Sequence, residues 1–97
     1  MRDPEIMQRV KDVLAQISAV APGRAVELRV PPYSAIQCVE GPKHTRGTPP
    51  NVVEMNAETL FALADGSLSW IDAVYNGAVL ASGERSDMSA VFTRIRL

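Results

Sequence analysis

Hydrophobic residues recur at helical spacing over the first part of the chain. One face of residues 3–21 carries only apolar side chains: Ile6, Val10, Val13, Leu14, Ile17 and Val20. Asp3 is suited to cap this helix, and Pro4 to occupy its first position. The polar face mixes acidic and basic residues, whereas a membrane-surface helix is rich in Lys and Arg. The pattern therefore predicts an amphipathic helix that docks on a hydrophobic core.

The segments that follow alternate with a period of two, which is typical of strands. Residues 25–30 place Val26, Leu28 and Val30 on one side of a half-buried strand. A second strand is predicted over residues 33–39, antiparallel to the first across a proline turn, because proline cannot donate to a strand ladder. Residues 51–55 and 78–82 predict two more strands.

The stretch from 51 to 83 also contains two short apolar helices. Asn56 is a good N-cap for the first of them, and Gly66 offers its C-terminal stop. Ser69 caps the second, with Asp72 in the capping-box position, and Gly77 ends it. Helices this short are not stable alone in water, so we expect them to lie on an apolar surface.

The order of elements predicts the fold class. A last helix is expected over residues 87–93, capped by Ser86, so the order is α-β-β-β-α-α-β-α. Helices and strands are segregated rather than alternating, which indicates an α+β fold with a mostly antiparallel sheet and helices packed on one face. The chain of 97 residues is predicted to form a single domain, 1–97.

Composition excludes several classes of function. The formal net charge of −1 provides no field that would gather nucleic acid. No apolar run approaches the roughly 20 residues needed to span a bilayer, and the N-terminus does not lead into a signal-peptide core, so we expect a cytoplasmic protein without stable membrane insertion. The single cysteine, Cys38, is expected to be a small buried hydrophobic residue, and no cofactor is indicated.

The irregular segment 40–50 gathers Lys43, His44, Thr45 and Arg46. These residue types could contact an anion or a polar headgroup, or they could form an ordinary solvated loop. The glycine–lysine–hydroxyl order of a Walker loop is missing. His44 is the only histidine and has no partner ligand nearby, so neither a metal site nor a catalytic nucleophile–base pair is predicted.

Beyond these patterns, the stretch from Asn56 to Phe92 resembles the sterol-carrier-protein family. Its features are a helix ending in glycine, a second helix placed by an acidic residue, a small-residue strand running to a Ser-Gly turn, and a last amphipathic helix. The segment GPKHTRGTPPNVVE resembles the loop and strand of a compact bacterial branch of that family. The resemblance implies a sterol-carrier-like fold that binds sterols, fatty acids or acyl-CoA without catalysis, in an apolar cavity between the sheet and the helices.

On this sequence, seven apolar residues could line such a cavity: Leu60, Phe61, Trp70, Ile71, Val74, Met88 and Phe92. The same stripe of residues also fits a filled core, since apolar residues at helical spacing are usually core. Two alternative functions stay open. One is a protein-interaction or homodimerisation module without a small ligand, and the other is an anion-binding accessory domain that uses the 40–50 loop.

Overall fold

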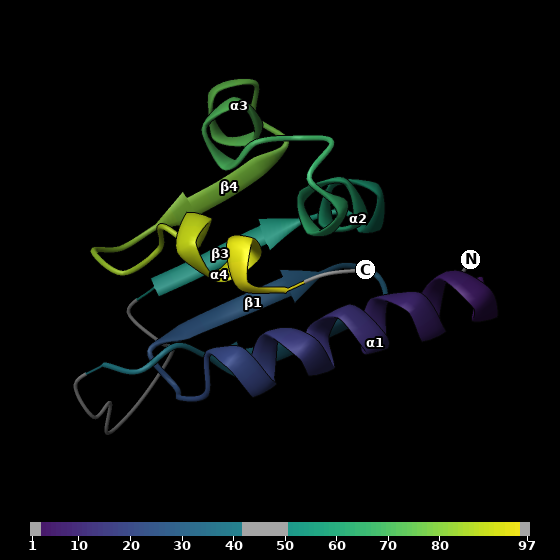
Figure 1. The fold of residues 1–97 in the computed structure, drawn as a ribbon, viewed down its shortest axis with the longest axis horizontal. Helices are drawn as coiled ribbons and strands as arrows, with labels where there is room; N and C mark the ends of the chain where they lie inside the picture. The colour runs from purple at the N-terminus through teal and green to yellow at the C-terminus, as the bar shows by residue number, and fades with distance from the viewer. Residues whose placement is uncertain (1–2, 42–50, 96–97) are drawn as a thin grey trace.

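The computed structural model describes residues 3–41 and 51–95. Its elements are α1 (Pro4–Val20), β1 (Val26–Val30), β2 (Ser34–Cys38), β3 (Asn51–Met55), α2 (Ala57–Asp65), α3 (Trp70–Tyr75), β4 (Val79–Ser82) and α4 (Ser89–Arg94). Their order matches the predicted one. Figure 1 shows α1 and α4 in front of the strands, α2 at one end of the sheet and α3 beside β4.

The four strands form one mixed sheet in the order β2-β1-β3-β4. Strands β1 and β2 are antiparallel, as are β3 and β4, but the central pair β1 and β3 is parallel. The prediction of a mostly antiparallel sheet is therefore wrong at the centre of the sheet. The reason is the position of β3. It runs opposite to β2, as the next strand of a hairpin would, but it pairs with the free edge of β1 instead of with β2 and is therefore parallel to β1.

One face of the sheet carries the hydrophobic core. Val26, Leu28 and Val30 are fully buried, and the inward side chains of α1 pack against them in the same core cluster. The opposite face is wetter: Glu27 and Arg29 are half-buried there and form an ion pair. This difference confirms the predicted half-buried first strand, and it places the helices and the core on the same side.

The helix termini follow the predicted caps. The Asp3 carboxylate accepts hydrogen bonds from the backbone N–H groups of Glu5 and Ile6 at the start of α1. Asn56 caps α2 by accepting from the N–H of Thr59 at 2.8 Å, and Gly66 ends that helix with a φ of +85°, in the left-handed region. A left-handed residue costs little as glycine, so this stop turns the chain sharply from α2 toward α3.

The last helix begins later than predicted. Helix α4 starts at Ser89, and Met88 at its N-cap position makes no side-chain capping hydrogen bond. Ser86 instead closes a turn, because both its hydroxyl and its backbone N–H donate to the carbonyl of Gly83. The Asp87 carboxylate then accepts the N–H of Ser89 at 2.9 Å.

A buried asparagine ties three parts of the fold together. Asn51, at the start of β3, is only 4% exposed. Its amide Nδ2 donates to the carbonyl of Ala25 at 2.8 Å, and its Oδ1 accepts the backbone N–H of Arg85 at 2.9 Å. Both ends of this side chain are satisfied, so Asn51 links the entry to β1 with the loop that leads to α4. Within residues 3–41 and 51–95, no helix has the length and apolar character needed to cross a membrane.

Candidate functional site

The candidate site is a groove of about 500 Å³ between α2, α3 and α4. None of its lining residues belongs to a strand, so it does not lie between the sheet and the helices, where the family resemblance implies a cavity. Its lining residues come from the last turn of α2, from the α2–α3 connection, from the first residues of α3 and from α4. The lining side chains are mainly apolar: Leu63, Ala64, Leu68, Trp70, Ile71 and Phe92. This volume lies within the range of roughly 300–1,000 Å³ that is usual for small-molecule pockets.

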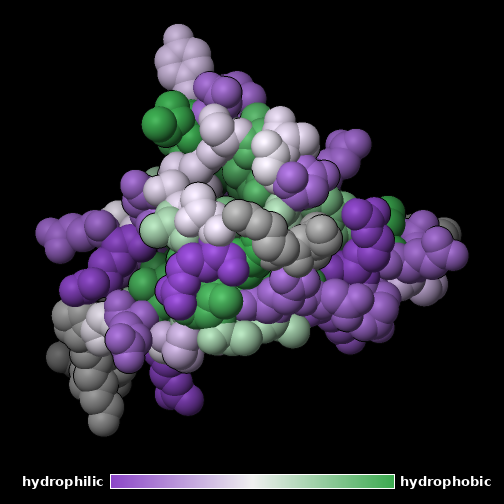
Figure 2. Space-filling view, viewed as in Figure 1, coloured by the Kyte–Doolittle hydropathy of each residue, from purple (hydrophilic) through white to green (hydrophobic). Residues whose placement is uncertain are grey.

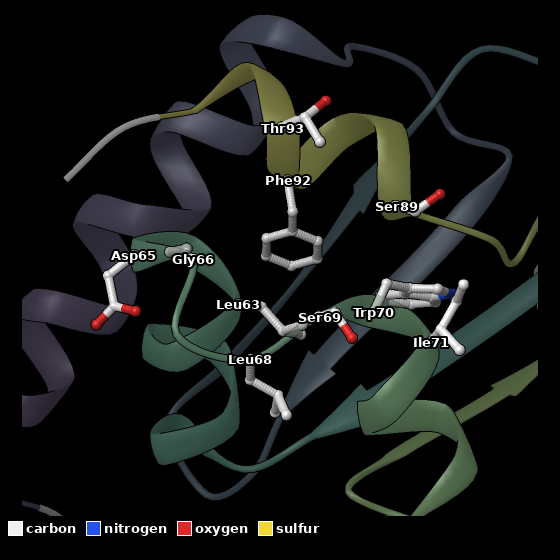
Figure 3. A pocket seen from close by; sticks show the side chains of 11 residues that line it. Leu63, Asp65, Gly66, Leu68, Ser69, Trp70, Ile71, Ser89, Phe92 and Thr93 are labelled. Carbon is white, nitrogen blue, oxygen red and sulfur yellow. The ribbon is translucent and has the colours of Figure 1, made fainter.

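Two aromatic rings form the centre of the groove. Figure 3 shows the ring of Phe92 pointing down from α4 toward Leu63, with Trp70 and Ile71 on one side and Gly66 on the other. The ring centroids of Trp70 and Phe92 are 6.1 Å apart, and their planes are inclined by 26°. Such an arrangement gives a broad, polarizable apolar surface, because offset aromatic pairs leave part of each ring face available.

The groove opens to solvent along its rim. Ile71 lines it and is nevertheless 77% exposed, and Asp65, Gly66 and Ser69 at the α2–α3 connection are exposed as well. A molecule in the groove would therefore be covered on one side and would remain in contact with water on the other.

Each hydroxyl group of the lining makes at least one hydrogen bond within the protein. The Ser69 Oγ accepts the backbone N–H of Asp72 at 3.1 Å, as the N-cap of α3. The Thr93 Oγ1 donates to the carbonyl of Ala90 at 2.7 Å. The Ser89 hydroxyl donates to the Asp87 carboxylate. The pKa of Asp87 is lowered first by the hydrogen bond from the Ser89 backbone N–H and then by the one from this hydroxyl. The groove thus offers a guest mainly carbon surface.

The Asp65 carboxylate, at the rim of the groove, is hydrogen-bonded by Ser67. Ser67, first through its hydroxyl and then through its backbone N–H, holds the pKa of Asp65 below the usual range of a carboxyl, and Arg9 contributes a smaller effect. Figure 3 shows the Asp65 carboxylate directed away from Phe92 and Leu63. This carboxylate is therefore placed to face solvent rather than a guest in the groove.

The structure brings together three of the seven residues predicted to line a cavity. Trp70, Ile71 and Phe92 lie in the groove. The other four lie elsewhere. Leu60 and Met88 are fully buried in the core, and Phe61 packs between α1 and α2, where the guanidinium Cζ of Arg9 is 4.0 Å from its ring centroid.

Val74, the last of the four, is 42% exposed on α3 and contributes to a separate hollow beside β4. The residues Lys43, His44, Thr45 and Arg46 lie outside the described part of the chain. Ligand binding by any of these residues stays a prediction.

Eight lining residues are not among the seven that the sequence predicts: Leu63, Ala64, Asp65, Gly66, Leu68, Ser69, Ser89 and Thr93. Leu68 stands in the short connection between Gly66, which ends α2, and Ser69, which caps α3. An apolar residue in such a connection is expected to pack beneath it. Ser89 and Thr93 flank Phe92 at helical spacing on α4, so the face of that helix that carries Phe92 would have indicated them.

In the described residues, no group of three or more His, Cys, Asp or Glu side chains is placed to hold a metal ion. A mainly carbon-lined groove, open on one side and built on three short helices, accommodates the apolar body of a small molecule.

These features define a small α+β domain with an apolar groove between its helices. A family model described as a bacterial SCP ortholog matches residues 2–93, so the chain belongs to this bacterial group within the sterol-carrier-protein family. The family resemblance in the sequence is thereby confirmed. A comparison with curated proteins finds no match.

Proposed function

We propose that the protein binds an apolar small molecule, of sterol, fatty-acid or acyl-CoA type, in the groove between α2, α3 and α4, and carries or stores it without catalysis. The observation on which the proposal rests is the groove itself: about 500 Å³, with the stacked pair Trp70 and Phe92 at its centre, in a chain of the sterol-carrier-protein family. The mainly apolar lining of the groove supports binding through the apolar body of the ligand.

The single tryptophan makes this proposal directly testable. Trp70 is the only tryptophan of the chain and it lines the groove. A long-chain fatty acid brominated along its chain should quench the indole fluorescence on contact, in a saturable way. Absence of quenching at every concentration below the solubility limit of the lipid would refute the proposal.

A matched pair of variants separates the groove from the rest of the core. Leu68 and Ile36 are both half-buried and both pack against the core, but only Leu68 lines the groove. Removing one apolar contact worth about 1.5–3 kcal/mol should weaken binding by roughly tenfold or more in Leu68→Ser. Ile36→Ser should leave the affinity within about twofold. Equal losses in both variants would mean that the lipid binds elsewhere.

The anion-binding alternative depends on Lys43 and Arg46, outside the described residues, and stays a prediction. The interaction-module alternative rests on the exposed hydrophobic side chains of α3 and β4.

A further inference from the structure

The large hydrophobic side chains that stand exposed in the described part of the chain all lie on α3 and β4. Ile71, Val74, Tyr75 and Leu80 are 77%, 42%, 91% and 63% exposed. In Figure 2, one green hydrophobic group stands near the top of the molecule, where Figure 1 places α3, with purple hydrophilic atoms around it. We call these four residues the α3–β4 face. Val74 and Leu80 line the same hollow, and exposed apolar side chains that gather on neighbouring elements are a feature of interaction sites.

The α3–β4 face has both a projection and a recess. Tyr75, at the end of α3, projects almost completely into solvent. Beside it lies a hollow of about 380 Å³, lined by Val74 of α3, by Leu80 of β4 and by Val52 and Glu54 of β3. Leu80 and Glu54 are directly opposite each other across the β3–β4 ladder. An aromatic projection thus lies next to an apolar hollow that contains one carboxylate.

We propose that the α3–β4 face joins two copies of this chain in a symmetric dimer, with Tyr75 of each copy in the hollow of the other. In a two-fold interface the same patch meets itself, so a projection must lie near a recess that can receive it. The chemistry also matches, because the tyrosine ring is apolar along Val74 and Leu80 while its phenol O–H can donate to the Glu54 carboxylate.

The available area fits a dimer of modest affinity. An aromatic side chain buries on the order of 150–250 Å² and an aliphatic one less, so complete covering of these four side chains would bury on the order of 500 Å² per copy. Two copies would then bury about 1,000 Å², which is the lower limit for a specific interface. We therefore expect monomer and dimer to exchange within an accessible concentration range.

A lipid surface is a poorer occupant of the same face. Asp72 is exposed on α3 directly after Ile71, and Glu54 contributes to the hollow. Carboxylates lose hydration in contact with hydrocarbon and find no donor there, whereas a second protein surface supplies the phenol O–H.

Sedimentation velocity of the full chain over a rising concentration series tests this proposal. The wild type should shift from monomer to dimer, and the double variant Tyr75→Ser/Leu80→Thr should weaken the dimer at least tenfold. Tyr75→Phe should weaken it less, since it removes only the phenol O–H. Ala19→Ser, at an exposed position on α1, is the control and should dimerise like the wild type.

Each alternative outcome overturns the proposal. A wild type that stays monomeric at all concentrations refutes it, and so does a dimer that the double variant leaves unchanged. A monomer that sediments with phosphatidylcholine vesicles through Tyr75 would assign the face to lipid instead. Tyr75 and Leu80 do not line the groove, although Ile71 of the same face does, so quenching of Trp70 by the brominated lipid is measured on the double variant as a separate readout.

Discussion

At the scale of single residues, the Cys38 thiol shows how burial decides chemistry. Its side chain is fully buried at the end of β2, and burial raises its pKa from 9.0 to about 11. The thiolate, which is the reactive form, is therefore suppressed in the folded protein. This agrees with the sequence-based interpretation of Cys38 as a small buried hydrophobe.

The raised pKa of Cys38 predicts a loss of stability at alkaline pH. The unfolded chain releases the thiol proton near pH 9, while the folded chain holds it until about pH 11. The contribution of the Cys38 thiol to the free energy of unfolding is fully present below pH 9. Between pH 9 and about pH 11 it declines by about 1.4 kcal/mol per pH unit. Urea unfolding at about pH 8 and about pH 10 measures this decline.

Other groups titrate in the same range, so the variant Cys38→Ala provides the comparison. It should show a smaller decline in stability than the wild type between the two pH values. Near pH 8, a disulfide reagent such as dithiobis-nitrobenzoate should label the thiol only after urea is added. Rapid labelling of the folded protein would contradict the burial.

At the scale of elements, the connection between α1 and β1 is held against the end of β2. Val39 has a φ of +68°, which is rare for a β-branched residue, and its carbonyl accepts the N–H of Ala25 at 2.9 Å. Gly23 has a φ of +142°, and a Cβ built on it would lie 2.2 Å from the Val39 carbonyl oxygen. Glycine is required here by both backbone conformation and space.

This contact predicts different costs for two glycine substitutions. Gly23→Ala should lower the free energy of unfolding by roughly 3 kcal/mol or more, because strain and a backbone clash add together. Gly66→Ala is the matched control: its φ is also positive, at +85°, but no atom lies within 4 Å of the added Cβ. It should cost only about 1–2 kcal/mol. Chemical denaturation measures the free energy of unfolding of both variants. Equal losses would mean that the backbone around Gly23 moves to accommodate the added Cβ at no cost.

At the scale of the whole molecule, local signals predicted the elements well. The caps Asp3, Asn56 and Ser69 and the stop at Gly66 act within one turn of the chain, so their residues suffice to place helix ends. The parallel pairing of β1 with β3 did not follow from the sequence, because alternation specifies which face of a strand is buried and not which neighbour it pairs with.

The site was predictable only in part, for a related reason. Helical spacing placed Trp70, Ile71 and Phe92 on apolar faces, but the same spacing describes Leu60 and Met88, which the structure buries completely. Whether an apolar side chain lines a groove or fills a core depends on the distance between α3 and α4, and that distance is set by tertiary packing. Ser86 was misplaced as a cap because its hydroxyl and N–H are used by the Gly83 turn.

Because the groove is bounded by three separate helices, a ligand in it should stabilise the whole fold. A ligand that binds only the folded chain adds about 2.7 kcal/mol at a concentration of 100 times its dissociation constant. For a domain of this size each kcal/mol raises the Tm by roughly 4–8 °C, so the brominated fatty acid should raise it by roughly 10–20 °C. Thermal unfolding followed by circular dichroism measures this shift. Leu68→Ser should reduce the shift at the same lipid concentration, whereas Ile36→Ser should lower the starting Tm and retain the shift. Quenching of Trp70 without any rise in Tm would mean that the lipid binds the unfolded chain equally well, and would remove the groove as the specific site.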